Sequence, residues 1–108
     1  MSLTALTYQI LVALADEARH GYGIIKEIEA RAGAAAAPST GALYLALQRM
    51  ESEGMVEEAP RPADDGDARR RYYRMTRKGR AAAEEESARL AGLVATAREK
   101  NLLAEGTP

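Results

Sequence analysis

Residues 39–54 constrain the fold more than any other stretch, because both ends and one face of a helix are marked there. Pro38 discourages an earlier start, and the hydroxyl of Ser39 can accept a hydrogen bond from a free backbone N–H, so the helix is predicted to begin there. Gly54 supplies the stop, in the left-handed conformation that commonly closes a helix. The apolar side chains recur at helical spacing and predict one stripe that faces a core: Leu43, Ala46, Leu47 and Met50.

The opposite face of this predicted helix carries hydrogen-bonding groups and no acid. Its members are Gly41, Leu45, Gln48 and Ser52, with Tyr44 and Arg49 on the flanks. Such a face suits a DNA major groove, where Gln and Arg read base edges and an aliphatic side chain contacts a thymine methyl. A solvated helix face is the simpler interpretation of this pattern alone, so the DNA hypothesis depends on the rest of the chain.

Two further helices are predicted before this one. Residues 3–15 form the first, and their apolar stripe is wider than one side of a small domain requires, so part of it is expected to face a partner. Residues 16–21 read as a connecting turn, Tyr22–Arg31 as the second helix, and residues 34–37 as a short link. Two helices joined by a short turn, the second with a polar outer face, make a helix-turn-helix.

A hairpin is predicted after Gly54. Met55–Glu58 is a strand candidate, residues 59–67 are dense in turn residues, and Arg70–Met75 alternate as a second strand with Tyr73 directed to the core. Behind a helix-turn-helix, such a hairpin is the wing of a winged helix. The predicted fold is therefore mainly α with a small β-hairpin.

Thr76 is predicted to cap a last helix that can run to about Ala104, roughly 40 Å at 1.5 Å per residue. The end of the chain, Asn101–Pro108, is expected to fray, so the last turn of this helix overlaps the frayed tail. Its apolar stripe extends farther than a three-helix domain can cover, so we expect it to pack on a second subunit. Glu84, Glu85 and Glu86 are interpreted as a solvated face and not as a metal or acid–base cluster. The expected dimerisation residues are Leu3, Leu6, Leu90, Leu93, Val94 and Ala97.

Composition narrows the function classes. The 108 residues include no cysteine and one histidine, and no paired nucleophile and base is evident, so no catalytic residue, metal ligand or cofactor is predicted. There is neither an apolar run near the ~20 residues of a membrane span nor a secretion signal, and a cytoplasmic protein with no membrane contact is expected.

Charge is distributed very unevenly, although the net charge is only −1. Residues 61–80 hold eight basic and three acidic side chains, a local balance of +5, whereas the remaining seven basic and thirteen acidic side chains give −6. A basic segment at the predicted wing favours contact with DNA phosphates and a steep salt dependence of binding.

Three motifs in order, His20–Ile28, Gly41–Glu51 and Arg70–Gly79, closely resemble the PadR-like transcriptional regulators over about residues 3–82. The resemblance implies a bacterial or archaeal homodimeric repressor, a winged helix-turn-helix followed by a C-terminal dimerisation helix. A single helix after the wing resembles the short branch of that family. Some short members bind flat aromatic drugs between subunits with a tryptophan of the last helix, and this chain has no Trp and no Phe, so it lacks that stacking device.

From the sequence we therefore expect a winged helix-turn-helix DNA-binding domain over residues 1–76 and a dimerisation helix with its tail over residues 77–108. The expected function is that of a homodimeric repressor on a pseudo-palindromic site in double-stranded DNA, relieved by a small-molecule effector. The alternative is a winged-helix protein-interaction module without DNA binding. The expected DNA-binding residues are Ser39, Thr40, Tyr44, Gln48 and Arg49 on the recognition helix, Arg69, Arg70 and Arg71 at the wing, Lys78 below it, and Tyr22.

Overall fold

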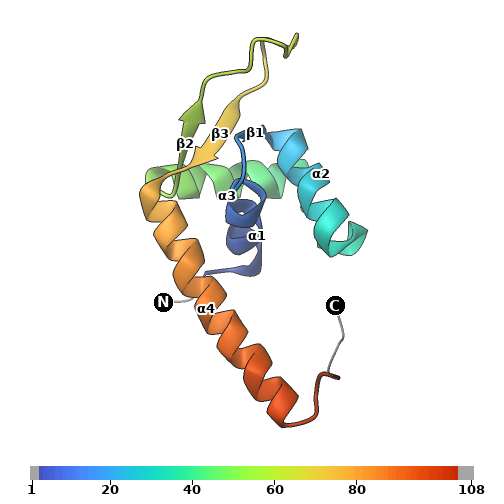
Figure 1. The fold of residues 1–108 in the computed structure, drawn as a ribbon. Helices are drawn as coiled ribbons and strands as arrows, with labels where there is room; N and C mark the ends of the chain where they lie inside the picture. The colour runs from blue at the N-terminus through green and yellow to red at the C-terminus, as the bar shows by residue number, and fades with distance from the viewer. Residues whose placement is uncertain (1–2, 105–108) are drawn as a thin grey trace.

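The computed structural model describes residues 3–104 of the chain. Figure 1 shows three short helices gathered into a body, a hairpin that rises from it, and a last helix that leaves it as an arm. The described residues span 51 × 27 × 23 Å. In chain order the elements are α1 (Ala5–Ala13), β1 (Arg19–His20), α2 (Gly21–Ala32), η1 (Ala34–Ala36), α3 (Thr40–Ser52), β2 (Val56–Ala59), β3 (Tyr72–Met75) and α4 (Arg77–Glu99).

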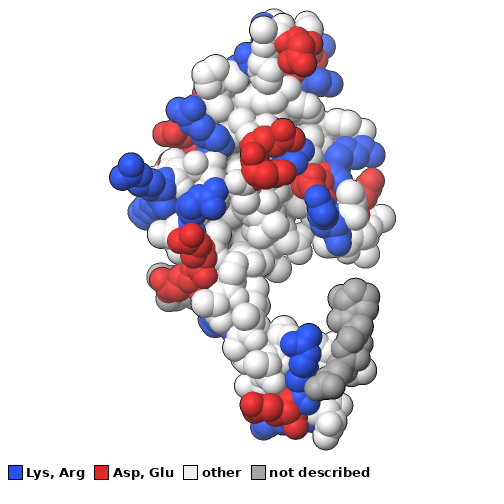
Figure 2. All heavy atoms as spheres, viewed as in Figure 1, with Lys and Arg blue, Asp and Glu red and all other residues white. Residues whose placement is uncertain are grey.

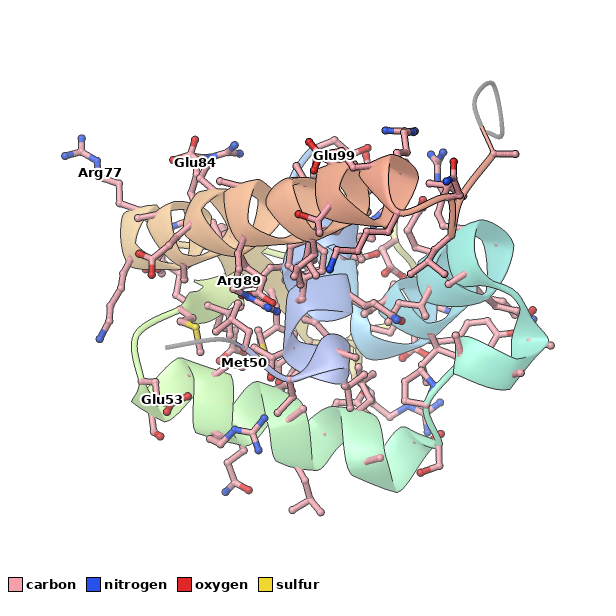
Figure 3. The ribbon with its side chains drawn as sticks, turned by 90° about the horizontal axis from the view of Figure 1, so that it is seen from below. Met50, Glu53, Arg77, Glu84, Arg89 and Glu99 are labelled. Carbon is pink, nitrogen blue, oxygen red and sulfur yellow. The ribbon has the colours of Figure 1, made fainter. Side chains whose placement is uncertain are left out.

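The core lies where α1, α2 and α3 meet the inner side of the hairpin. Figure 3 shows α1 between α3 on one side and α4 on the other. The predicted inner stripe of α3 is buried along its whole length, and Tyr73 of β3 is buried too, as the sequence predicted. The buried apolar residues are Ile10, Leu11, Ala13, Leu14, Ile24, Ile28, Leu43, Ala46, Leu47, Met50, Met55, Val56 and Tyr73.

Each α-helix begins with a side chain that accepts a hydrogen bond from the backbone N–H three residues later. The caps are Thr4, His20, Ser39 and Thr76. Two of these, Ser39 and Thr76, were predicted as caps, and Gly54 has the expected left-handed φ of 78° after α3. A side-chain acceptor satisfies one of the free donors at a helix start, so these residues place the four helix starts.

The predicted connecting turn at residues 16–21 was wrong in one respect, because it contains a strand. Arg19 pairs with Tyr73 and His20 with Tyr72, so β1 joins the hairpin in a sheet of order β1-β3-β2. On the other edge, the β2–β3 register runs from Val56 opposite Met75 to Ala59 opposite Tyr72. A strand of two residues is too short to show alternation in the sequence, so the pattern could not predict it. Its pairing with β3 connects the start of α2 to the hairpin.

The last helix ends five residues earlier than the predicted Ala104. Asn101 has a left-handed φ of 62°. Its N–H donates to the carbonyl of Arg98 at 3.0 Å, and the N–H of Leu102 donates to that of Ala97 at 2.8 Å. These two bonds are the Schellman pattern, which Asn can close in place of Gly. Of the tail expected to fray, the structure describes residues 101–104, and residues 105–108 lie outside it.

The interpretation of the three consecutive glutamates as solvated was wrong for Glu86. Its side chain is buried and accepts from Nε and Nη2 of Arg89 at 3.0 and 2.6 Å. The Arg89 guanidinium holds the pKa of Glu86 below its ordinary value. Glu84 and Glu85 are exposed as expected, because successive helical positions point in different directions. Within residues 3–104, no helix has both the length and the apolar character to cross a membrane.

The end of α3 and the start of α4 are joined by backbone contacts. The Thr76 hydroxyl donates to the carbonyl of Gly54 at 2.5 Å, and the Thr76 N–H donates to that of Met55 at 3.1 Å. Gly79 lies so close to the Met55 carbonyl that a Cβ atom there would overlap the oxygen. This α3–α4 junction therefore requires glycine in the first turn of α4.

We expect Gly79→Ala to lower the free energy of unfolding by about 2–3 kcal/mol, because the clashing atom belongs to the backbone and cannot turn aside. Gly92→Ala is the matched control, since space around Gly92 is open and alanine favours a helix by about 1 kcal/mol over glycine. Urea unfolding at one protein concentration measures both. Equal stability of the Gly79 variant and the parent would refute the close approach.

Candidate nucleic-acid interface

The outer face of α3 is exposed along its length. Leu45 is 69% exposed, and Gly41, Gln48 and Ser52 are exposed on the same side. In Figure 3 this helix lies on the far side of α1 from α4, so the arm does not cover it. The structure thus brings together on one surface the side chains expected to read base edges.

Two of the expected contact residues, Tyr44 and Tyr22, lie on α3 and at the start of α2. The hydroxyl end of Tyr44 lies against Gly21, where a Cβ atom would overlap it, while part of the ring stays exposed. Tyr22, which follows Gly21 in α2, is exposed. Its ring is parallel to the His20 ring at a centroid distance of 6.4 Å, and Nζ of Lys26 lies 5.3 Å from the centroid of the Tyr22 ring. Tyr22 is thus an exposed residue at a helix start, close to cationic and aromatic groups.

At the N-terminal end of α3, Ser39 already uses its side-chain oxygen. It accepts from the N–H of Ala42 at 3.1 Å, and its exposed hydroxyl keeps a proton to donate. Thr40, the first helical residue, is exposed. Free N–H groups at a helix start attract anions, so this end of α3 suits a phosphate.

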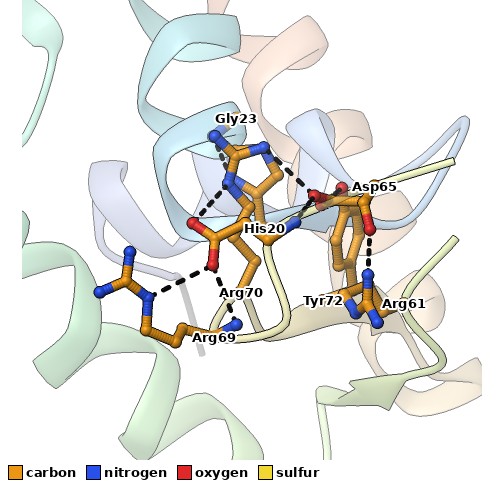
Figure 4. Close-up of polar contacts among 8 residues, drawn as sticks. His20, Gly23, Arg61, Asp65, Arg69, Arg70 and Tyr72 are labelled. Atoms are coloured by element: carbon orange, nitrogen blue, oxygen red, sulfur yellow. Dashed lines mark hydrogen bonds and ion pairs between the residues drawn. The ribbon is translucent and has the colours of Figure 1, made fainter.

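The wing loop is organised around Asp65, which sequence reasoning did not single out. Its side chain is 5% exposed, and it accepts from the Tyr72 hydroxyl at 2.5 Å and from the N–H of Asp67 at 2.9 Å (Figure 4). These bonds, that of Tyr72 first, lower the pKa of Asp65. The ionised carboxylate therefore stabilises the loop at ordinary pH, and this contribution is lost as the pH falls through the lowered pKa. The run of aspartates around Gly66 was the signal for a side-chain-stabilised turn.

His20 links this loop to α2. The edge of its ring meets the Tyr72 ring at a centroid distance of 5.2 Å, and its Nδ1 accepts from the N–H of Gly23 at 3.1 Å. Burial lowers the pKa of His20, and the charge of Arg70 lowers it further. A neutral imidazole can accept at Nδ1, so these two influences support its role as the cap of α2.

The three wing arginines all lie beside carboxylates. Nε of Arg69 is 3.4 Å from Oδ1 of Asp67, Nη1 of Arg70 is 3.6 Å from Oδ1 of Asp65, and Nε of Arg71 is 3.9 Å from an oxygen of Glu58. Arg69 is 93% exposed. Figure 2 shows basic and acidic side chains interspersed over the face it presents, the hairpin included. The basic segment is thus present as expected, but its charge is partly neutralised within the loop.

Arg49 and Lys78 lie at the C-terminal end of α3. Nη2 of Arg49 donates to Oγ1 of Thr7 in α1 at 3.0 Å, so its side chain is turned toward α1. Lys78 passes beside Gly54, its Cδ 3.7 Å from the position of a Cβ there. Both side chains therefore belong to the flank of α3 that faces α1 and α4.

The expected dimerisation residues divide into two groups. Leu3 and Leu6 are partly buried against the core of their own chain. Leu93 and Val94, in the C-terminal half of α4, are 55% and 40% exposed. Leu90 and Ala97 are half-buried on the same helix. The structure thus leaves an apolar stripe uncovered on α4.

A hollow of about 390 Å³ lies between α1 and α2. Its lining is mainly apolar and includes the charged side chains of Asp16, Glu27 and Arg31. The residues that line it are Tyr8, Gln9, Val12, Ala13, Ala15, Asp16, Glu27, Ile28, Arg31 and Ala32. Among the residues that the structure describes, no group of three or more His, Cys, Asp or Glu side chains could hold a metal ion.

Comparison with known proteins gives a consistent result. The sequence profile of the transcriptional regulator PadR-like family matches residues 10–85. A PadR-like regulator from Bacillus cereus is 28% identical with a TM-score of 0.73 and 93% of each chain covered. A PadR-family regulator from Clostridium difficile has a TM-score of 0.75 at 24% identity, over 87% of this chain and 95% of that one. Lactococcus lactis ZitR, at 20% identity and a TM-score of 0.72, shares the fold over 97% of this chain and 65% of its own. No curated protein matches the sequence.

If the wing arginines bind phosphates, Asp67 competes with DNA for Arg69 and Arg70. We expect Asp67→Asn to tighten binding to any duplex by about threefold, since the amide keeps the oxygen that accepts from the Arg69 N–H but loses the charge. Asp64→Asn is the matched control: it removes the same charge from an exposed side chain of the same loop. Titration of labelled DNA measures both, and equal effects of the two variants would rule out specific competition.

Proposed function

The chain belongs to the PadR-like family of DNA-binding transcriptional regulators, and from this premise we propose that it is a sequence-specific repressor that binds DNA as a homodimer. The proposal includes a cytoplasmic location, where such a regulator meets the chromosome. It also includes a pseudo-palindromic operator, because a two-fold symmetric dimer presents two recognition helices one helical turn apart.

The observation that carries this proposal is the exposed outer face of α3 beside the start of α2. In the proposed complex, α3 enters the major groove with Gln48 and Leu45 toward the base edges. In the same proposed complex, Tyr22, Tyr44 and the helix start at Ser39 and Thr40 contact phosphates on one side. Arg69, Arg70 and Arg71 reach the backbone from the wing, after exchanging their carboxylate partners for phosphate oxygens.

The residues of α4 support a dimer. The arm is 23 residues long, about 34 Å at 1.5 Å per residue, and α1 and β3 contact only part of it. Leu93 and Val94 remain exposed in the C-terminal half of α4. A continuous apolar stripe on an exposed helix is most stable against another apolar surface, and a second copy of α4 offers one with the same pattern. We therefore propose that residues 1–76 bind DNA and that residues 77–108, which contain α4, form the dimerisation part of the chain.

We also propose relief of repression by a small molecule. The hollow between α1 and α2 supports this, because α2 carries Tyr22 and contacts Tyr44 through Gly21. The hollow is lined by the second half of α2, from Glu27 to Ala32, and a ligand there would displace this helix relative to α3. A compound that both raises the unfolding temperature and releases DNA would identify the effector, and a compound that stabilises the protein without releasing DNA would not.

The alternative, a protein-interaction module without DNA binding, is favoured by one observation, the carboxylate beside each wing arginine. Fluorescence anisotropy decides between the two. The purified protein is titrated into a labelled fragment from upstream of its own gene and into random DNA, at two salt concentrations. Tighter, salt-sensitive binding to the upstream fragment supports the repressor, whereas no binding to either DNA at low salt supports the interaction module.

Once an operator has been identified, two variants distinguish residues that contact base edges from residues that contact phosphates. We expect Gln48→Ala to lose about tenfold on the operator and little on random DNA, because a Gln that reads a base edge carries sequence preference. The double variant Arg70→Ala, Arg71→Ala should weaken binding to both DNAs by the same factor. It should also reduce the slope of the logarithm of the binding constant against the logarithm of salt concentration by about 2. If Gln48→Ala lost the same factor of affinity on the operator and on random DNA, Gln48 would not be a base-reading residue.

The dimer is tested with Leu93→Glu. A carboxylate in the apolar stripe would raise the dimer dissociation constant by about a hundredfold or more, while the monomer is little affected because Leu93 is already exposed in it. Ala95→Glu puts the same charge on another face of α4 and serves as the control. Sedimentation equilibrium measures both. A dimer that tolerates Leu93→Glu but not Ala95→Glu would place the interface on the other face.

A further inference from the structure

We propose that Arg49 and Lys78 together hold one backbone phosphate of DNA in a cleft between α1, α3 and α4, so that Arg49 anchors α3 and does not read a base. The inference rests on the proposed DNA-binding function. The cleft has a volume of about 370 Å³. Its lining residues are Leu3, Thr4, Thr7, Arg49, Glu53, Met55 and Lys78.

The direction of Arg49 is set by a buried hydroxyl of another helix. Oγ1 of Thr7, a residue only 3% exposed, accepts from Nη2 of Arg49 at 3.0 Å and from the Thr4 hydroxyl at 2.8 Å. Nη2 thus points toward α1 and away from the outer face, where Gln48 lies. A guanidinium has five N–H donors, and a bond to Thr7 occupies one, which leaves a fork for a phosphate that enters the cleft.

Lys78 is placed by the α3–α4 junction. It lies in the first turn of α4, directly before Gly79, whose contact with the Met55 carbonyl brings that turn against the end of α3. A cation in the first turn of a helix is disfavoured by the helix dipole, and a bound anion removes this penalty. Within the described residues, neither Lys78 nor Arg49 has a carboxylate within ion-pair distance, although Glu53 lines the same cleft.

A DNA phosphate fits this cleft better than a free anion does. The cleft is open, and the Glu53 carboxylate lowers its attraction for a small anion in solution. DNA bound to α3 brings its backbone to the flanks of the helix, so the rest of the interface provides the affinity. An arginine fork and a lysine that approach from two elements are a common arrangement around a phosphate.

The test replaces operator phosphates one at a time with neutral methylphosphonates. For the parent protein, we expect one position in each half-site at which this replacement costs about three- to tenfold in affinity. Arg49→Met and Lys78→Met should each bind more weakly by a similar factor, equally on operator and random DNA, and should lose their sensitivity at that one position. Arg77→Met, which removes the neighbouring exposed cation outside the cleft, should keep it.

Thr7→Val is a second variant, because it removes the oxygen that orients Arg49 while Arg49 itself remains. We expect a smaller loss of affinity and a reduced sensitivity at the same phosphate, with the fold checked by circular dichroism. If Arg49→Met instead keeps the parent's sensitivity at every phosphate and loses preference for one base pair, Arg49 reads a base and the inference is overturned while the repressor stands. If the parent protein binds no DNA, the proposed function itself fails.

Discussion

The approach of the first turn of α4 to the carbonyl of Met55 is the contact on which the arrangement of the other elements depends. Gly79 permits it, and Thr76 reinforces it by donating to Gly54 from its side chain and to Met55 from its backbone. The chain has left α3 at Gly54 and returns there after the whole hairpin. The junction therefore fixes the base of the wing, the direction of α4, and the place of Lys78 beside Arg49.

A second set of contacts holds the other end of β3. Tyr72 lies opposite His20 in the sheet, its ring meets that of His20, and its hydroxyl binds Asp65 in the wing loop. Because His20 is also the cap of α2, one tyrosine connects the wing to the helix that supports Tyr22. The central strand is thus fixed to α3 and α4 at one end and to α2 at the other, so these contacts connect the surfaces proposed to contact DNA.

The sequence predicted the features that depend on local chemistry. The caps at Ser39 and Thr76, the stop at Gly54 and the inner stripe of α3 follow from spacing and residue type, and all are confirmed. The short strand β1, the burial of Glu86 and the loop bonds of Asp65 depend on the packing of distant segments or on loop geometry, which no local pattern reveals. The direction of Arg49 belongs to the same class, since Thr7 that orients it lies 42 residues earlier.

The carboxylates beside the wing arginines also bear on how fast the protein meets DNA. Charges that are already paired, in a chain of net charge −1, create little field beyond the Debye length of about 8 Å at physiological salt. Little long-range attraction would then guide the first encounter. The association rate constant is therefore expected to be roughly 10⁵–10⁶ M⁻¹s⁻¹, the range for partners without electrostatic steering. Discrimination between DNA sites would therefore arise mainly in the lifetime of the complex, after the arginines have exchanged carboxylate for phosphate.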